Sequence, residues 1–276
     1  MKTIHTLKKV SLATFLTFVL SFSSVFAQND TMYIMKSGAI VGQYNVNTEL
    51  DSVIFYKPTI EETTSGTFID SRDGNEYNWV QIGDQVWMAE NLAYLPSVNM
   101  VFDGSEDAAG SYYYVYGYDG TNVADAKATD NYATYGVLYN CTAAMNGEAS
   151  STTNPSGIQG VCPAGWHLPS DDEWTVLTDY LGGTSVAGGK LKETGTTHWA
   201  SPNTGATNET GFTALPGGGR DDVCTFLGIG LGGLWWSATE SSATYAWSRY
   251  MDYDTSGVTR HGNSKEVGFS VRCVRD

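Results

Sequence analysis

The chain of 276 residues is acidic, with 30 Asp and Glu against 15 Lys and Arg, and it contains 31 glycines. A chain with this negative charge repels phosphate backbones, which argues against nucleic acid as a partner. Its length fits one large domain, or one domain with a small appendage. The many glycine and aromatic residues favour short strands joined by tight turns, with few helices.

The first 27 residues have the pattern of a secretory signal peptide. Three lysines precede an apolar stretch over residues 10–22, and Val25-Phe26-Ala27 supplies the small residues that a signal peptidase requires. The apolar stretch is shorter than the roughly 20 residues of a membrane span. A buried first helix is the alternative. No other stretch is apolar enough to cross a bilayer, so no transmembrane segment is expected.

Removal of this leader would leave a mature chain that begins at Gln28. Without the three leader lysines, 12 Lys and Arg face 30 Asp and Glu, which gives a net charge near −18. No cysteine near the cleavage point supports a lipid anchor. We therefore expect a chain that is secreted, periplasmic or held at the cell surface.

Residues 28–56 predict a short N-terminal β segment. Strands are expected over residues 32–36, 39–46 and 52–56, and Ser37-Gly38 is expected to turn the first corner. Residues 57–65 are polar and contain proline, which predicts a linker. The β segment is too small to hold a core of its own, so it is either a set of docking strands or a spacer.

The main domain is predicted to span residues 66–276 and to open on a three-stranded antiparallel meander. Asp73-Gly74 and Gly83-Asp84 are expected to form its two tight turns, because glycine tolerates the positive φ that such turns require. Residues 96–131 follow without a clear period and contain a run of tyrosines. This stretch predicts a long loop with aromatic packing of its own.

A helix is predicted to begin after Ser170. Ser170 and Glu173 have the spacing of a capping box, and Asp171 and Asp172 add negative charge at the positive end of the helix dipole. Gly182-Gly183 is expected to end the helix. We interpret the three acids as capping residues rather than as a catalytic pair. The side chains expected on its core face are Trp174, Leu177, Tyr180 and Leu181.

Four cysteines in an exported chain suggest disulfides, and four cysteines allow three connectivities. The residue types alone do not choose among them. His167 and Cys162 lie five residues apart and would supply half of a zinc site, but no matching half follows elsewhere in the sequence. We therefore expect His167 to hydrogen-bond a turn.

Five stretches in one order resemble the Fibrobacter succinogenes major paralogous domain family, which is common in secreted proteins of Bacteroidetes and Fibrobacteres. Among them are "GDQVWMAENL", "GVCPAGWHLPSDDEW", "GLWWSATE" and "GFSVRCVRD". The resemblance runs from about Gly66 to Asp276. That family is similar to C-type lectin-like domains and, more distantly, to formylglycine-generating enzymes. It implies an α+β fold with short antiparallel sheets, two helices, neighbouring termini and a long loop region before the "WW" strand, and it implies no activity.

The resemblance also implies a disulfide, because in lectin-like domains the cysteine before the first helix pairs with one in the last strand. In this chain those cysteines are Cys162 and Cys273, and Trp166 is then a core residue. Cys141 and Cys224 form a second pair or stay free. Formylglycine-generating enzymes use two redox cysteines with a bound copper, but those enzymes carry both cysteines close together near the end of the chain.

Two pairs of aspartates suggest calcium as a cofactor, and no other cofactor is expected. Asp252 and Asp254 lie in "DYDTSG", which matches the first six positions of an EF-hand loop. Asn263 stands where the twelfth position requires Glu, so a hairpin turn is the preferred interpretation. Asp221 and Asp222 lie in the long loop region where lectin-like domains bind calcium, although the tripeptide of the sugar-binding members is missing.

Residues 195–234 form a long loop region without clear periodicity, and so long a loop is usually functional or disordered. The alternative is a cap in which Trp199 and Phe212 fill a small core of the loop's own. Strand alternation is expected to send the adjacent Trp235 and Trp236 to opposite faces. The ligand-binding residues, expected to be partly exposed along one concave surface, are Trp199, Arg220, Asp221 and Asp222.

The sequence therefore predicts an exported, non-catalytic module for binding or surface interaction, with an extracellular glycan or protein as its partner. The alternative is a carbohydrate-binding accessory domain, dependent on calcium or not. The third hypothesis is an oxidase similar to formylglycine-generating enzymes, or another enzyme.

Overall fold

The computed structural model describes residues 31–36, 39–45 and 64–276. The chain divides into two compact units, residues 1–60 and 61–276, which are described separately. In the first unit, β1 (Thr31–Lys36) and β2 (Ala39–Asn45) pair antiparallel, close to the first two predicted strands. The predicted signal peptide, Gln28, the turn at Ser37-Gly38 and the strand over 52–56 lie outside the described residues, as does nearly all of the predicted linker.

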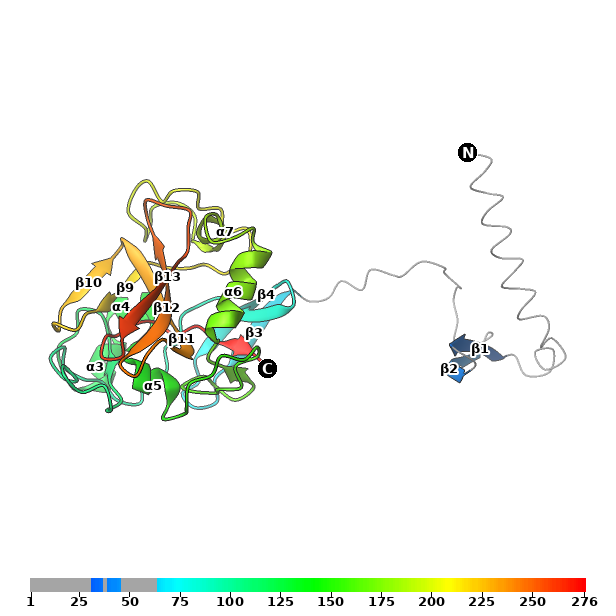
Figure 1. Ribbon diagram of the computed structural model, residues 1–276, viewed down its shortest axis with the longest axis horizontal. Coiled ribbons are helices and arrows are strands. Elements are labelled where there is room, and N and C mark those ends of the chain that lie inside the picture. Colours follow the sequence, from blue (N-terminus) through cyan, green and yellow to red (C-terminus); the bar gives the residue numbers. More distant parts are fainter. Residues whose placement is uncertain (1–30, 37–38, 46–63) are drawn as a thin grey trace. The chain divides into compact units, whose positions relative to one another are not determined.

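One sheet of the second unit contains both its first and its last strand. The strands follow the order β3-β4-β5-β14-β8, and neighbouring strands are antiparallel. The first strand and the end of the chain therefore share one sheet, close to the C label in Figure 1. These strands are β3 (Ser65–Ile69), β4 (Glu76–Ile82), β5 (Gln85–Met88), β8 (Trp166–His167) and β14 (Val274–Arg275).

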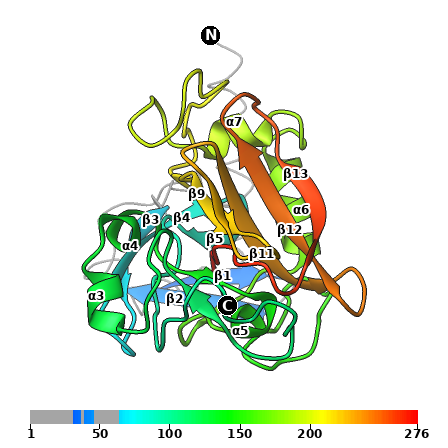
Figure 2. The same cartoon turned by 90° about the vertical axis from the view of Figure 1, so that its left-hand side faces the viewer.

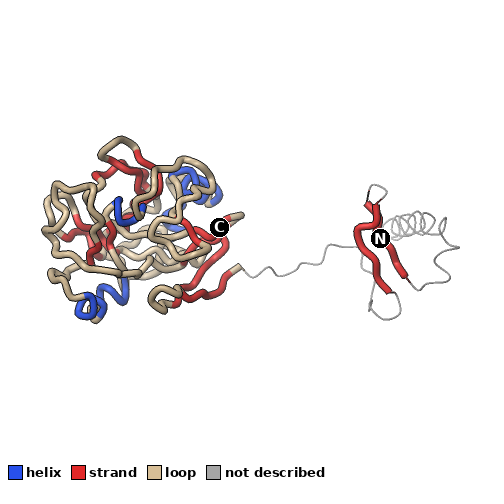
Figure 3. Tube along the Cα trace, turned by 90° about the horizontal axis from the view of Figure 1, so that it is seen from below, coloured by secondary structure: helices blue, strands red, loops and turns tan. Residues whose placement is uncertain are grey.

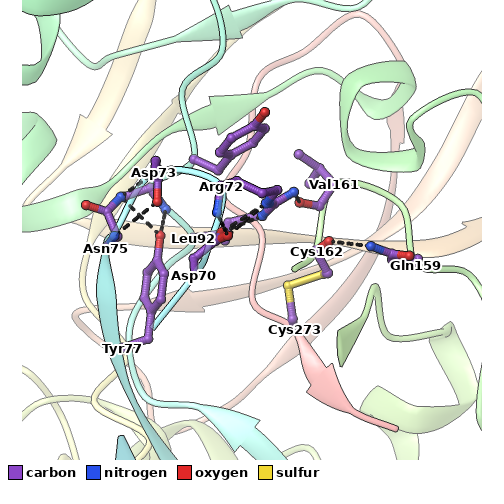
Figure 4. Close-up of polar contacts among 12 residues, drawn as sticks. Asp70, Arg72, Asp73, Asn75, Tyr77, Leu92, Gln159, Val161, Cys162 and Cys273 are labelled. Atoms are coloured by element: carbon purple, nitrogen blue, oxygen red, sulfur yellow. Dashed lines mark hydrogen bonds and ion pairs between the residues drawn. A yellow bond between two sulfur atoms is a disulfide. The ribbon is translucent and has the colours of Figure 1, made fainter. Parts of the chain in front are cut away.

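The predicted meander is present as β3-β4-β5, but only one of its two turns has the expected form. Gly83-Asp84 forms the predicted two-residue turn, with Gly83 at φ +62°. Asp73-Gly74 was expected to do the same, and this prediction is wrong, because six residues connect the last paired positions of β3 and β4. Arg72 lies inside that turn, and its Nη2 pairs with Oδ2 of the buried Asp70 at 2.6 Å (Figure 4).

The second sheet is also five-stranded, with the order β10-β9-β11-β12-β13. Its strand pairs are antiparallel, except that β9 and β11 run parallel. The α6 helix (Asp171–Tyr180) packs against β11 and β12, as Figure 2 shows. The strands are β9 (Gly217–Arg220), β10 (Phe226–Ile229), β11 (Gly232–Glu240), β12 (Tyr245–Asp252) and β13 (Thr259–Ser264).

The described residues contain five helices instead of the two that the resemblance implies, and only α6 is longer than six residues. Short helices persist here because a side chain caps each of three N-termini, at Asn122, Thr129 and Asn140. The unit is therefore a mixed α/β fold with mostly sheets and few short helices (Figure 3). The remaining elements are β6 (Tyr113–Tyr114), α3 (Val123–Lys127), α4 (Asp130–Tyr135), β7 (Leu138–Tyr139), α5 (Cys141–Met145) and α7 (Ala187–Leu191).

Two hydrophobic cores lie on opposite faces of β11. The adjacent Trp235 and Trp236 are both fully buried, one in each core, as strand alternation predicts. The predicted core positions Trp174, Leu177 and Leu181 of α6 are buried in the core of Trp235. The expectation for Tyr180 is wrong, because it is 65% exposed at the end of α6. Gly83 packs against its ring, and any larger residue there would meet it.

The disulfide implied by the resemblance is confirmed. Cys162 and Cys273 are bonded, with their Cα atoms 6.0 Å apart, and they join the segment before α6 to the chain immediately before β14. Trp166 is buried as expected, and its ring stacks on Phe68 at 4.4 Å. Cys141 and Cys224 are buried and free, so a second disulfide is not formed.

Candidate functional site

Trp199, expected at an exposed binding surface, is instead buried. Only 1% of the residue is exposed, and its indole Nε1 donates to the carbonyl of Ala214 at 2.9 Å. Phe212 is buried in the same core, with its ring near those of Trp87 and Trp174. The two side chains therefore fill the core that α6 shares with β4 and β5, and not a small core of the loop's own.

The guanidinium of Arg220 also faces inward, so its expected exposure is wrong. The residue is fully buried and donates to the main-chain carbonyls of Val101, Asp103 and Glu266 at 3.0 to 3.1 Å. Its Nη2 also lies 3.0 Å from Sγ of Cys224. These contacts show that Arg220 holds irregular loops together from inside.

Asp221 and Asp222 nevertheless lie on the same side of the domain as Arg220. The three residues line a hollow of about 350 Å³ against the second sheet. A second hollow of about 290 Å³ adjoins it and shares Leu227, Leu234, His261 and Asn263 with the first. We call the two together the open sheet hollow. Of the four predicted ligand residues, three border this hollow and Trp199 does not.

Two of the four predicted calcium residues, Asp221 and Asp252, bind groups of the protein. Oδ1 of Asp221 accepts from the amide of Thr225 at 2.7 Å, and Asp252 accepts from the hydroxyl of Tyr250. In the part of the chain that the structure describes, no three His, Cys, Asp or Glu side chains gather as they would around a metal ion.

His167 lies between two carboxylates rather than at a metal site. Its Nε2 is 2.7 Å from Glu173 and its Nδ1 is 2.7 Å from Asp276, while Cys162 is engaged in the disulfide. Burial alone would lower the pKa of His167, but the hydrogen bonds and charges of the two carboxylates outweigh it and raise that pKa. The histidine therefore ties the start of α6 to the end of β14.

The capping box of α6 is present, as predicted, with reciprocal bonds between Ser170 and Glu173. Asp171 does more than the sequence indicates, because Oδ1 accepts from Arg249 at 2.6 Å and Oδ2 pairs with Arg260 at 2.9 Å. Burial would raise the pKa of Asp171, and the two arginines more than offset this and lower it. Every acid but Asp172 in this first turn is thus bound within the protein.

The two free cysteines have surroundings that differ. Burial raises the pKa of Cys141 to about 12, so it is a thiol at neutral pH. Copper and other soft metals bind the thiolate. Cys224 lies in the turn between β9 and β10 against Arg220. Cys141 and Cys224 therefore belong to separate elements and are not bonded to each other.

A larger depression, of about 580 Å³, lies on the first sheet and was not predicted from the sequence. Its walls come from β3, β4, the segment after β5, the end of α4 and residues 211–215. Apolar side chains such as Trp79, Val80 and Leu215 form much of its lining, and we call it the polar groove after the amide, hydroxyl and carboxylate groups that stand among them. The polar lining residues are Ser65, Thr67, Asn75, Glu76, Asn78, Glu90, Asn91, Tyr132, Thr134 and Thr213.

Glu90 and Asn78 form the polar centre of this groove. The carboxylate of Glu90 accepts from the main-chain amide of Asn78 at 2.8 Å and from its side-chain Nδ2. Asn75 donates through Nδ2 to Asp73 at 2.9 Å. The Oδ1 atoms of Asn75 and Asn78 accept no hydrogen bond from any described residue, so both can receive one from a ligand.

A buried cation lies behind the groove. Arg272 is 1% exposed, and its Nη2 donates to Oδ1 of the groove residue Asn91 at 3.1 Å. Burial lowers the pKa of Arg272 to about 9, and the charge of Glu90 opposes that shift. None of the described residues that line the groove is Lys, Arg or His. The groove therefore has an acidic rim, with one guanidinium beneath it.

The sequence offers little that would have located this groove. Alternation along β4 places Asn78 and Val80 on one face of the strand, but asparagine and glutamate are common on exposed strands. The site forms only when the segments around residues 65–67, 75–80, 89–93, 132–136 and 211–215 come together.

Comparison with known proteins identifies one family. The family model described as the Fibrobacter succinogenes major domain matches residues 80–275. No curated protein and no solved structure matches the chain. Among the described helices, none has both the length and the apolar composition needed to cross a membrane.

Proposed function

The chain belongs to the Fibrobacter succinogenes major domain family, and we propose that it is an exported binding module whose polar groove holds a neutral, hydroxyl-rich ligand of the glycan class. The observation that carries this proposal is the pair of side-chain oxygens, on Asn75 and Asn78, that no described residue uses. Asn78 is exposed and Asn75 is half-buried, so water reaches both oxygens and a ligand hydroxyl can take its place.

The chemistry of the groove suits a sugar ring. Each hydroxyl of a sugar both donates and accepts, and Asn75, Asn78 and Glu90 offer acceptors beside amide donors. The volume, about 580 Å³, lies within the usual range of small-molecule sites. The acidic rim disfavours phosphate, sulfate and uronic acid groups, because a carboxylate such as Glu76 repels them.

We also propose that the second unit has a C-type lectin-like fold. Its support is the Cys162–Cys273 bond between the segment before α6 and the last strand, together with the shared sheet of β3 and β14. Export to the periplasm, the cell surface or the medium is proposed from the signal-peptide pattern over residues 1–27. A non-catalytic role is proposed with it.

A second candidate is a protein partner at the open sheet hollow. Leu227 and Tyr245 are 45% and 47% exposed beside it, and Asp222 adds an exposed acid. Exposed apolar groups rimmed by polar ones mark interaction surfaces. The oxidase hypothesis has weaker support, because Cys141 and Cys224 come from separate elements, the start of α5 and the turn between β9 and β10, and are not bonded to each other.

An array of neutral, acidic and sulfated glycans, read in calcium and in EDTA, tests the first proposal. We expect binding to neutral glycans that is equal in both buffers. Asn78→Ala and Glu90→Gln should each weaken that binding about tenfold, the loss expected when a hydrogen bond to a charged or buried partner is removed.

Asn263→Ala is the matched control, because it removes the same amide from the open sheet hollow. Its binding should equal that of the unaltered chain. If Asn263→Ala lost glycan binding and Asn78→Ala did not, the binding site would lie in the open sheet hollow. Binding confined to acidic glycans would contradict the proposal.

A further inference from the structure

Lys192 follows α7 directly and buries a primary ammonium group with no acid in hydrogen-bonding contact. The residue is fully buried. Its Nζ donates to three main-chain carbonyls, those of Thr204 at 3.1 Å, Asp252 at 2.8 Å and Thr255 at 2.8 Å. An ammonium group has three protons to donate, so each proton has one partner.

The ammonium joins three separate segments of the chain. Lys192 directly follows α7, and Thr204 lies in the loop after it. Asp252 is the last residue of β12, and Thr255 lies in the turn that follows. The segments approach closely because two glycines of α7 have no side chain: a Cβ on Gly188 would lie 2.2 Å from the carbonyl oxygen of Gly257, and one on Gly189 would lie 2.4 Å from that of Gly205. The glycines of α7 therefore allow the close contact, and Lys192, the residue immediately after α7, supplies the cation.

Trp199 forms a further wall of this site. Its ring centre lies 5.2 Å from Nζ of Lys192, within the range of a cation–π contact. Burial lowers the pKa of Lys192 to about 8, and the charges of Asp252 and Asp254 oppose the shift. The group consequently remains mostly charged at pH 7.

We propose that the carbonyls of Thr204, Asp252 and Thr255 form a cation-binding site, here called the cation seat, which the Lys192 ammonium occupies. A calcium ion binds there only when that ammonium is removed. The seat has the features of a site for a hard cation: carbonyl oxygens from irregular loops and the carboxylates of the "DYDTSG" turn nearby. The lysine supplies the positive charge that a calcium ion would otherwise bring to these oxygens.

This arrangement accounts for the half-match of that turn to a calcium loop. Asp252 and Asp254 stand at the expected positions, but Asp252 accepts from the hydroxyl of Tyr250 and from the amide of Asp254. Because the Lys192 ammonium already supplies the positive charge at this place, the turn does not need a complete set of calcium ligands. The native residues therefore do not fit a metal ion at this turn.

Thermal unfolding of the full chain in EDTA, in magnesium and in calcium tests the proposal. The unaltered chain should unfold at one temperature in all three. Lys192→Ala should unfold at a lower temperature in EDTA and regain part of the loss in calcium, with a smaller gain in magnesium, because calcium accepts irregular carbonyl geometry. Calorimetric titration should find a calcium affinity of about 10⁻⁴ to 10⁻³ M for the variant, typical of extracellular modules.

Two variants serve as controls. Lys192→Met removes the charge but fills the space, so it should be destabilised and insensitive to calcium. Lys190→Ala lies two positions earlier in α7, where the lysine makes a surface ion pair with Glu209, and it should respond to no metal. Should Lys192→Ala fold only in calcium, the proposal is supported.

Three outcomes would overturn the proposal. The first is a calcium-dependent rise in the unfolding temperature of the unaltered chain that Asp252→Asn abolishes. The second is a Lys192→Ala variant whose unfolding temperature is the same in calcium and in EDTA. The third is failure of that variant to fold in either.

Discussion

The start of α6 and the polar groove contain the same kinds of side chain but use them differently. At the start of α6, Glu173 accepts from the amides of Ser156 and Ser170 and binds His167. In the groove, by contrast, the Oδ1 atoms of Asn75 and Asn78 accept no hydrogen bond from the described residues. One region satisfies its polar atoms internally, and the other leaves some of them to solvent or to a ligand.

This difference separates scaffold from site. A fully satisfied polar network in a low-dielectric interior fixes one structure, and loss of one member leaves its partners unpaired at a high cost. A polar group with an unused acceptor adds little to folding, but it can add to binding. Substitutions near α6 should therefore change stability, and substitutions in the groove should change binding with little effect on stability.

The largest effect on stability is expected for the disulfide that anchors the scaffold. Cys162→Ser opens a link between residues 111 positions apart. The chain-entropy model gives a loss of about 4 to 5 kcal/mol for a loop of this size, or roughly 8 to 20 °C in unfolding temperature. An unchanged unfolding temperature would show that the Cys162–Cys273 disulfide does not stabilise the fold. A peptide map that links Cys162 to Cys141 or Cys224 would show that the disulfide is assigned to the wrong pair.

The next effect concerns Asp171. Asp171→Asn keeps the shape of the side chain but leaves Arg249, whose side chain is 2% exposed, without its acid. Removing one partner of a buried ion pair costs about 3 to 5 kcal/mol, and denaturant unfolding would measure it. The exposed neighbour Asp172 is the control, since Asp172→Asn should cost less than about 0.5 kcal/mol. Equal effects of the two variants would show that charge at the helix terminus, and not the buried pair, is responsible.

A smaller effect is expected from pH through His167. Its pKa is raised above 6.5 in the folded chain by Glu173 and Asp276, against the effect of burial. The stabilisation is therefore complete below the unfolded pKa of about 6.5 and is lost as the pH rises through the higher folded value. Between about pH 5 and pH 9, the unfolding temperature of the unaltered chain should decrease with rising pH, and it should decrease more than that of His167→Gln. If the unfolding temperatures of the two chains changed with pH in parallel, His167 would not be the source of the pH dependence.

The smallest effect on stability is expected in the groove. Asn78→Ala removes an exposed amide whose only side-chain partner among the described residues is Glu90. The free energy of unfolding, measured with denaturant, should change by less than about 0.5 kcal/mol, even though glycan binding weakens about tenfold. A destabilisation comparable to that of Asp171→Asn would make Asn78 part of the scaffold and remove the distinction between the two regions.

The sequence predicted best where interactions are local. The capping box spans four residues, and the opposite burial of Trp235 and Trp236 follows from the period of a strand. The pairing of Cys162 with Cys273 was predicted from the family resemblance and not from a local pattern. The partners of Asp171, by contrast, lie 78 and 89 residues away, beyond any local pattern.

The wrong expectation for Arg220 in the long loop region has a physical cause. Irregular chain leaves main-chain carbonyls without partners, and buried carbonyls require donors. Lys192, Arg220 and Arg272 supply those donors from inside, each fully or almost fully buried. A sequence shows a basic residue in a loop and suggests an exposed binding group, because the carbonyls that will bury it are not visible in the sequence.

The most direct test of the account is to locate the bound ligand. Amide resonances of the ¹⁵N-labelled chain would be followed during titration with the neutral glycan that gives the strongest array signal. The account predicts that the shifted amides belong to β3, β4 and residues 211–215, which line the polar groove. Shifts confined to residues 221–231 and 259–264, around the open sheet hollow, would contradict it, as would the absence of binding to any neutral glycan.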